Sequence, residues 1–199
     1  RLVEREQRRD HFPAALRLLV RGFLYYSDES ADGYAKALRE FQAAAQTEWG
    51  QAEDDTGQEI LYYFLGGAHL QQLIFAVQEN ASIDERREII YSALDGYEKA
   101  VELNENYLRA VNGQAAGAVQ LARLAQVESG STCGWDWGWL DEGERGYQKV
   151  LEIVGVGYRA QVWAQPRCEA GFVQVAGGEG EHVGDAIAVI CVQHLPIEC

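Results

Sequence analysis

Apolar residues recur at spacings of three and four along nearly the whole chain, and this periodicity limits the possible folds more than any other feature. One such helical face is formed by Tyr34, Ala37, Leu38, Phe41 and Ala44. This spacing places side chains on one face of a helix, whereas a strand requires a period of two. The sequence therefore predicts an all-α fold.

Short polar segments divide the helical stretches into pairs. Pro13 stands at a favourable first helical position, and Ser82 with Glu85 has the spacing of a capping box, in which each side chain binds a free backbone N–H. Short turns between consecutive helices favour antiparallel neighbours. The predicted hairpins cover about residues 13–46, 59–104, 107–154 and 158–195.

The last predicted hairpin has the weakest pattern. Its first helix is expected over about residues 158–175 and its second over 182–195, but Pro166 and Gly171 are both poor residues for a helix interior. With this hairpin included, the helical pattern covers nearly all of residues 1–199. We therefore expect a single domain.

Two of the predicted second helices share one pattern, a large residue, then a small, an aromatic and a small residue at relative positions 0, 3, 7 and 10. These residues are Tyr34, Ala37, Phe41 and Ala44 in one helix, and Ile90, Ala93, Tyr97 and Ala100 in the other. The pattern resembles the second helix of a tetratricopeptide repeat. In front of the second set, Tyr62, Leu65 and Gly66 resemble the aromatic-x-x-Leu-Gly of that family's first helix.

The resemblance weakens in some positions. His69 stands where the family usually has an aromatic residue, and Glu105 stands where it usually has Pro. Later copies are partial: Gly143, Tyr147 and Val150 match the end of the pattern, and Val183, Ala186 and Ile190 match most of it.

The resemblance implies antiparallel helical hairpins stacked as a tetratricopeptide-like α-solenoid. Physical reasoning agrees, because a small Ala lets paired helices approach closely while the aromatic residue one turn later fills the gap to the next hairpin. The alternative is an ordinary all-α bundle, in which Ala and aromatic residues also recur at helical spacing.

Charge and hydropathy narrow the choice of partner. The chain carries 31 acidic and 17 basic residues, a net charge of −14, which argues against a nucleic-acid surface. Long apolar stretches such as residues 14–26 are interrupted by Arg17 and Arg21, so no membrane segment is expected.

Residue patterns typical of metal or cofactor sites are absent from the sequence. The four Cys form no CxxC pair, the four His show no HExxH spacing, and no glycine-rich phosphate loop follows a strand. Helix-borne acids such as Asp95 and Glu98 are spaced as a solvent face, and no Ser or Cys lies in a nucleophile elbow. We expect no cofactor, no metal, no catalytic residue and no enzymatic activity.

Two local features leave alternatives open. Trp135, Trp137 and Trp139 lie in a Gly-rich connection and either stack on a ligand or fold back over the core, the second being favoured. The acidic run over residues 53–55 lacks the alternating ligands of a calcium loop, so a solvated turn is expected.

The repeat register predicts a concave groove lined by the first helix of each hairpin. The predicted lining is Tyr63 and Gln71 from the second hairpin, Arg109, Asn112 and Gln120 from the third, and Trp163 and Arg167 from the fourth. This mixed lining favours a non-catalytic module that binds a peptide segment of a partner protein. Because Arg pairs well with carboxylates, Arg109 and Arg167 suggest that the segment carries an acidic group.

The alternative function is a structural or regulatory helical domain that packs against other domains of a longer chain, for which a broad apolar strip would be typical. The sequence begins at Arg1 without a signal pattern, so we expect an incomplete N-terminus and a cytoplasmic location.

Overall fold

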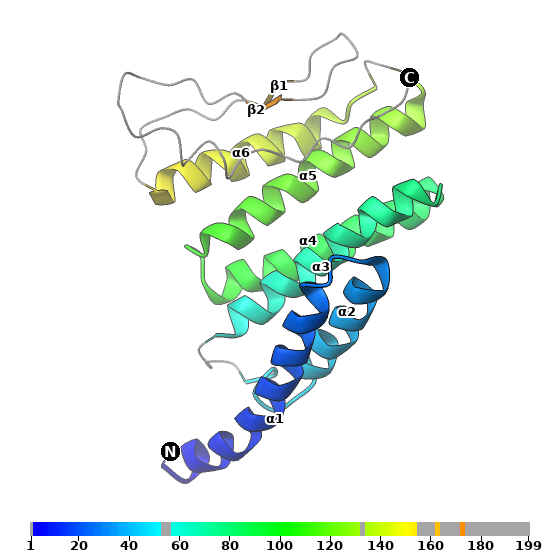
Figure 1. The fold of residues 1–199 in the computed structure, drawn as a ribbon. Helices are drawn as coiled ribbons and strands as arrows, with labels where there is room; N and C mark the ends of the chain where they lie inside the picture. The colour runs from blue at the N-terminus through cyan, green and yellow to red at the C-terminus, as the bar shows by residue number, and fades with distance from the viewer. Residues whose placement is uncertain (1, 53–56, 132–133, 155–161, 164–171, 174–199) are drawn as a thin grey trace, which may run out of the picture. The chain divides into compact units, whose positions relative to one another are not determined.

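The computed structural model describes residues 2–52, 57–131, 134–154, 162–163 and 172–173. Helices in this part of the chain form three consecutive antiparallel pairs (Figure 1). They are α1 (Leu2–Tyr26) with α2 (Ala31–Ala45), α3 (Gln58–Gln78) with α4 (Ile83–Leu103), and α5 (Leu108–Ser129) with α6 (Trp137–Val154). The all-α hairpin architecture is confirmed, and the predicted hairpins 59–104 and 107–154 agree with the helices to within one residue. The predicted start of the first hairpin is wrong, because α1 begins at Leu2 and Pro13 lies inside the helix.

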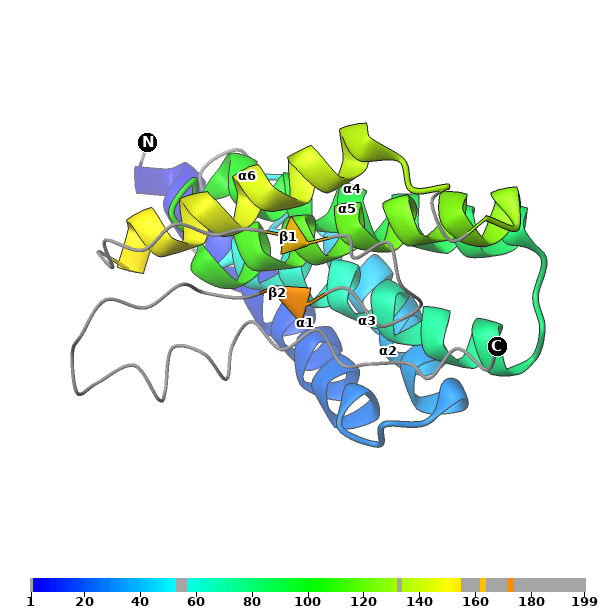
Figure 2. The same cartoon turned by 90° about the horizontal axis from the view of Figure 1, so that it is seen from above.

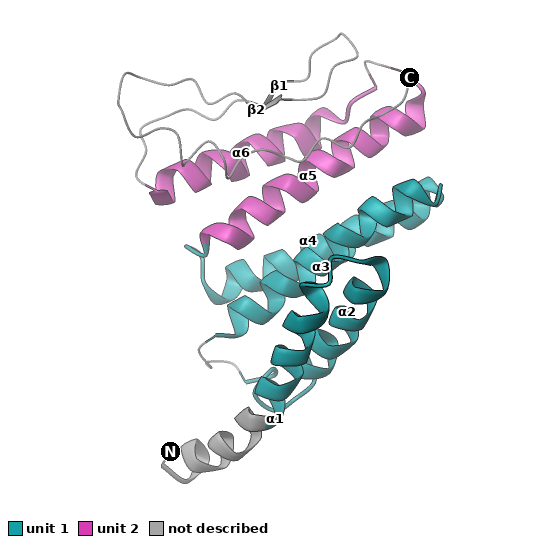
Figure 3. Ribbon diagram, in the orientation of Figure 1, with its two compact units in different colours: residues 1–107 teal, residues 108–199 magenta. Residues whose placement is uncertain are grey.

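The chain divides into two compact units (Figure 3). Residues 1–107 contain the hairpins α1–α2 and α3–α4, which pack on each other through α2 and α3. Residues 108–199 contain the hairpin α5–α6, and Figures 1 and 2 both show α5 beside α6 and α1 beside α2. The sequence predicts that residues 1–199 form a single domain. That statement is about how the two units are joined, and it stays a prediction.

The prediction of a helix over about residues 158–175 is wrong where the structure describes this segment. Strand β1 (Val162–Trp163) pairs antiparallel with β2 (Phe172–Val173), with Val162 opposite Val173 and Trp163 opposite Phe172. All four residues are β-branched or aromatic, types that favour strands, and Pro166 and Gly171 between them disfavour a helix. The helix predicted over 182–195 lies outside the described residues.

Side-chain caps mark where the second helix of each hairpin in unit 1 begins. The Ser30 hydroxyl accepts the backbone N–H of Gly33 at 2.9 Å, which starts α2. The predicted capping box of α4 is confirmed, since Ser82 accepts the N–H of Glu85 at 3.2 Å and donates its own N–H to the Glu85 carboxylate at 2.8 Å. Each cap satisfies backbone donors that the helix itself leaves free.

Helix α6 begins at Trp137, within the Gly-rich connection that contains the three Trp residues. The Asp136 carboxylate accepts the backbone N–H of Trp139 at 3.2 Å, so an acidic cap rather than the Gly-rich stretch decides the start of the helix.

The residues of the repeated pattern form the core. Ala37, Phe41 and Ala44 on α2, like Ala93 and Ala100 on α4, are completely buried. Tyr97 is also buried, and desolvation raises the pKa of its phenol far above the usual range. In unit 2 the corresponding Tyr147 is 1% exposed, and burial raises its pKa to about 12. The sequence therefore predicts these core positions correctly.

Helices α3 and α4 cross with their backbones in contact. A methyl group added at Gly96 would lie 2.6 Å from the backbone nitrogen of Gly66, and one added at Gly66 would lie 2.7 Å from the carbonyl oxygen of Ala93. Both distances are well inside van der Waals contact, so the crossing requires glycine on both helices.

An aromatic network joins the two hairpins of unit 1. The ring of Phe64 on α3 lies 4.6 Å from that of Phe23 and 5.3 Å from that of Tyr26, both on α1 and both in edge-to-face geometry. Phe23 in turn meets Phe41 of α2 at 5.4 Å. These ring pairs add to the stabilisation from apolar burial and fix how the second hairpin rests on the first.

Helix α3 has an unusual composition for its place between α2 and α4. By length and composition it qualifies as a membrane span, because an 18-residue window within it has a mean hydropathy of 1.3. No Asp, Glu, Lys or Arg follows Glu59 before the helix ends, whereas residues 14–26, which predict no membrane segment, are interrupted by two Arg. In the structure 22% of the window is buried, and its apolar residues supply much of the core of unit 1.

Replacing Gly96 with Ala tests the helix crossing. Because the added methyl meets only backbone atoms, we expect overpacking to exceed the gain in helix propensity, with a net loss of about 1–2 kcal/mol in the free energy of unfolding. Denaturant unfolding measures it. Glu98→Ala, on the exposed side of the same helix, should change stability by less than about 0.5 kcal/mol. Equal effects at both positions would contradict the described crossing.

Candidate functional site

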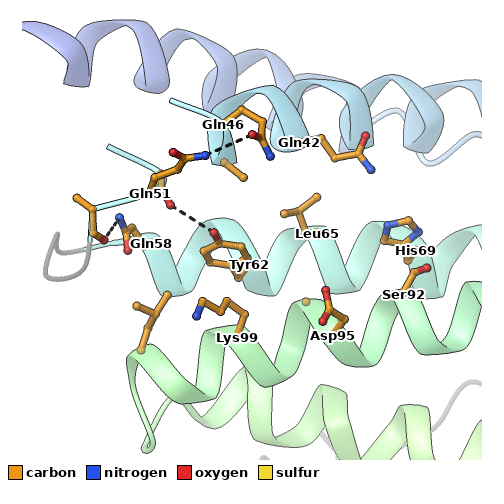
Figure 4. A pocket seen from close by; sticks show the side chains of 15 residues that line it. Gln42, Gln46, Gln51, Gln58, Tyr62, Leu65, His69, Ser92, Asp95 and Lys99 are labelled. Carbon is orange, nitrogen blue, oxygen red and sulfur yellow. Dashed lines mark hydrogen bonds between the residues drawn. The ribbon is translucent and has the colours of Figure 1, made fainter. Parts of the chain in front are cut away.

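A pocket of about 610 Å³ lies within unit 1, between α2 and α4 and above α3 (Figure 4). Its surface is polar and apolar in about equal parts, and its lining includes side chains of all three helices and of the connection after α2. The polar lining residues are Gln42, Gln46, Gln51, Gln58, Tyr62, His69, Ser92, Asp95 and Lys99. Leu65, which is 8% exposed, is an apolar lining residue contributed by α3.

At one end of the pocket the polar side chains bond to the connection between α2 and α3. The side-chain amide of Gln58, which is only 2% exposed, donates to the carbonyl oxygen of Ala52 at 2.9 Å and to that of Trp49. The Tyr62 hydroxyl donates to the carbonyl oxygen of Gly50 at 3.3 Å. This end is a fixed wall whose hydrogen-bonding groups are already used.

Lys99 lies at the same end of the pocket, and its side chain is also bonded to another residue. Its ammonium group bonds the Glu102 carboxylate at 2.9 Å, and that bond raises the pKa of the lysine. The charge of Lys99 is therefore balanced within α4.

The opposite end of the pocket is different. Here Gln42 comes from α2, His69 from α3, and Ser92 and Asp95 from α4 (Figure 4). Within the described part of the chain, the side chains of these four residues make no hydrogen bond or ion pair. Their donors and acceptors remain available to a molecule that enters the pocket.

The imidazole of His69 is uncharged near neutral pH. Burial lowers its pKa below the ordinary value of 6.5, and the nearby carboxylate of Asp95 only partly opposes that shift. A neutral imidazole has one ring nitrogen that donates and one that accepts, so His69 can bind either kind of group.

Ser92, His69 and Asp95 are the residue types of a hydrolytic triad. Neither the Ser92 hydroxyl nor the Asp95 carboxylate is hydrogen-bonded to the His69 ring, so the nucleophile–base and base–orienter contacts are not formed. Among the described residues no group of three His, Cys, Asp or Glu side chains is placed to hold a metal ion. The arrangement is suited to hydrogen-bonding a ligand.

The two predicted groove residues of unit 1 do not line this pocket. Tyr63 is half-buried, and its ring packs 5.0 Å from Phe64 and 5.6 Å from Tyr107, so it extends the aromatic network. Gln71, also half-buried, lies two residues beyond His69 on α3.

The other predicted groove residues belong to unit 2. Arg109 is exposed on α5, and Asn112 and Gln120 are half-buried on the same helix. The side-chain oxygen of Asn112 is buried without a hydrogen-bond partner among the described residues. Trp163 lies on strand β1 instead of the expected helix, and Arg167 lies outside the described residues.

The two local alternatives of the sequence analysis have different outcomes. Trp137 is 61% exposed, so the favoured prediction that the three indoles fold over the core is wrong for this residue. Trp135 and Trp139 are half-buried, and the indole N–H of Trp135 is buried without a hydrogen-bond partner among the described residues. The whole acidic run over 53–55 lies outside the described residues.

The repeat register does not predict this pocket, because it places binding on the first helix of each hairpin. Two walls of the pocket come instead from the second helices, α2 and α4. The available signal was Ser92, Asp95 and Lys99 at helical spacing on one face of α4, with Gln42 and Gln46 one turn apart on α2. Such spacing is also that of a solvent face, which is how Asp95 was interpreted.

Comparison with protein-family models, curated proteins and solved structures finds no match to this chain.

Removing the buried amide of Gln58 tests the fixed wall. Gln58→Ala leaves the carbonyl groups of Trp49 and Ala52 without their shared donor, and we expect a loss of about 1–3 kcal/mol in the free energy of unfolding. Chemical denaturation measures the loss. The control is Gln51→Ala, an exposed position that should cost less than about 0.5 kcal/mol. A Gln58 variant as stable as the control would show that these bonds are not formed.

The lowered pKa of His69 predicts a dependence of stability on pH. Above pH 6.5, the ordinary value, the imidazole is neutral in both states and contributes nothing. As the pH falls through the window between 6.5 and the lowered folded-state pKa, the unfolded chain binds the proton first and the protein loses stability. Comparing His69→Gln with the intact protein cancels the other titrating groups. The difference in unfolding free energy should shift in favour of the variant across this window, and a constant difference would contradict the assignment.

Proposed function

We propose that this chain is a non-catalytic protein-interaction module, built from stacked helical hairpins, that binds an extended peptide segment of a partner protein. The observation that carries the proposal is the pocket of unit 1, in which four polar side chains from three helices have no bonds of their own. An extended backbone presents N–H and C=O groups that Gln42, Ser92 and His69 can satisfy.

The dimensions of the pocket support a peptide over a flat protein surface. Its volume of about 610 Å³ falls within the range of about 300–1,000 Å³ that is typical of small-ligand sites. Its two walls are the helices α2 and α4, which belong to different hairpins. A segment of a few residues lying over Leu65 would contact both walls at once.

The tetratricopeptide family remains part of the proposal. In its favour, the residues that carry the resemblance are buried where two helices pair, including Ala93 and Tyr97, and Gly66 lies at the tightest crossing. The position of the pocket departs from the groove that the resemblance implies, since that groove is lined by first helices. We therefore propose unit 1 as the binding unit and the faces of α2 and α4 as its contact surface.

Recognition of an acidic group is a separate part of the proposal. It rests on Arg109 and Arg167, of which the structure describes Arg109 as an exposed residue of α5. An acidic segment bound there would use unit 2 and would be independent of the pocket in unit 1.

One observation favours the alternative, a structural domain packed against others. Leu16, Val20 and Leu24 lie one turn apart on α1 and are 45%, 49% and 68% exposed. A row of exposed aliphatic side chains of this kind is typical of a helix face that another domain covers. The α1 face and the pocket involve different residues, so the two functions can be separated experimentally.

Blocking the pocket tests the proposed function. Ser92 is exposed on α4, and Ser92→Trp places an indole in the pocket. Ala43→Trp is the matched control, because it places the same side chain on an exposed position of α2 outside the pocket lining. Proteins captured by the intact chain should be retained by the Ala43 variant and fall by roughly tenfold with the Ser92 variant, as loss of several hydrogen bonds predicts.

A further variant distinguishes the alternative. If the chain acts through the α1 face, Ser92→Trp leaves the captured proteins unchanged and Val20→Glu removes them. Quantitative mass spectrometry of the captured proteins reads out every variant, and equal capture by the intact protein and the Ser92 variant would overturn the pocket assignment.

A further inference from the structure

We propose that the pocket of unit 1 selects its peptide segment by a basic side chain, which Asp95 receives at the open end of the pocket. The inference rests on the proposed function and specifies the chemistry of the partner. The segment bound by unit 1 would carry a positive charge, whereas Arg109 and Arg167 suggest a segment with a negative charge.

The open end of the pocket is rich in hydrogen-bond acceptors. Asp95 supplies two carboxylate oxygens, and Gln42 adds the oxygen of its amide. Ser92 adds a hydroxyl oxygen, and His69 adds one ring nitrogen because its lowered pKa keeps the imidazole neutral near pH 7. Guanidinium and ammonium groups present only donors, so their chemistry complements this set.

Asp95 forms no direct ion pair among the described residues, although its charge contributes to the raised pKa of Lys99. The nearest described cation on the same helix face, Lys99, bonds Glu102 at 2.9 Å. Elsewhere on α4, Arg87 bonds Asp84 at 2.6 Å. These two cations of α4 are bonded to other acids, and the carboxylate oxygens of Asp95 are available to a cation from outside.

Other ligand classes fit the open end less well. An anion would meet the Asp95 carboxylate without a free cation beside it, since Lys99 is already paired. An apolar side chain would cover four polar groups without satisfying any of them, at a cost in desolvation. A basic side chain satisfies the charge and the acceptors together, and charge-assisted bonds are the strongest of the available hydrogen bonds.

The experiment uses random short peptides that are displayed on phage and selected for binding to the whole chain of residues 1–199. Asp95→Asn removes the proposed charge while keeping the size of the side chain. Glu98→Gln is the matched control, since it removes one negative charge from the exposed surface of α4 outside the pocket lining. Ser92→Trp reports whether selection depends on the pocket. Circular dichroism confirms that every variant is folded.

The expected result is an enrichment of Arg or Lys at one fixed position among peptides selected on the intact protein and on the Glu98 variant. Peptides selected on Asp95→Asn should lack that enrichment. For the best selected peptide, replacing the basic residue by neutral citrulline should weaken binding by roughly tenfold to the intact protein and leave binding to the Asp95 variant unchanged.

The outcomes separate the two proposals. Peptides that depend on Ser92 but show no basic preference would overturn the inference and leave the proposed function standing. The same basic preference on Asp95→Asn or on Ser92→Trp would overturn the inference too, because the net charge of −14 would then explain it. Failure to select any peptide that Ser92→Trp loses would overturn both.

Discussion

The close crossing of α3 and α4 determines much of the architecture of unit 1. With Gly66 and Gly96 on the facing sides, the two backbones touch, and the aromatic ring of Tyr97 covers the contact instead of separating the helices. Close pairing leaves the faces of α3 that carry Phe64 and Leu65 for the neighbouring hairpin, where Phe23 and Tyr26 meet Phe64. The close pairing of α3 and α4 therefore determines which side chains of α3 are free to contact the neighbouring hairpin. This is expected for units that bury their apolar surface only by stacking.

The pocket shows how polar groups are distributed on such a scaffold. Gln58 and Tyr62 donate hydrogen bonds to carbonyl groups of the connection that follows α2, and these bonds give one end of the pocket a rigid wall. At the other end, the side chains of Asp95 and His69 make no hydrogen bond or ion pair among the described residues. Unsatisfied groups cost little while water reaches them, and they become valuable when a ligand replaces that water.

The sequence predicts the hairpins and their core because these depend on spacing within one helix. Ala93 and Tyr97, for example, must share a face whatever the rest of the chain does. The strand containing Trp163 escaped prediction because valine and aromatic residues fit a buried helix or a strand, and period alone does not distinguish short apolar runs. The sequence does not predict the role of Asp95, because residues on a solvent face and residues on a pocket wall have the same helical spacing. Only the position of α2 next to this face distinguishes the two cases.

A pocket with walls in two hairpins has mechanical consequences. Gln42 on α2 and Ser92 on α4 line the pocket from different hairpins, so the width between them depends on how one hairpin packs on the other, a packing to which the contact of Phe23 with Phe64 contributes. A bound segment would behave as a wedge, holding that rotation at one value and making unit 1 stiffer. Conversely, a force that changes the packing of the two hairpins within unit 1 would alter the width of the pocket, so the affinity for the segment and the packing of the hairpins would be coupled.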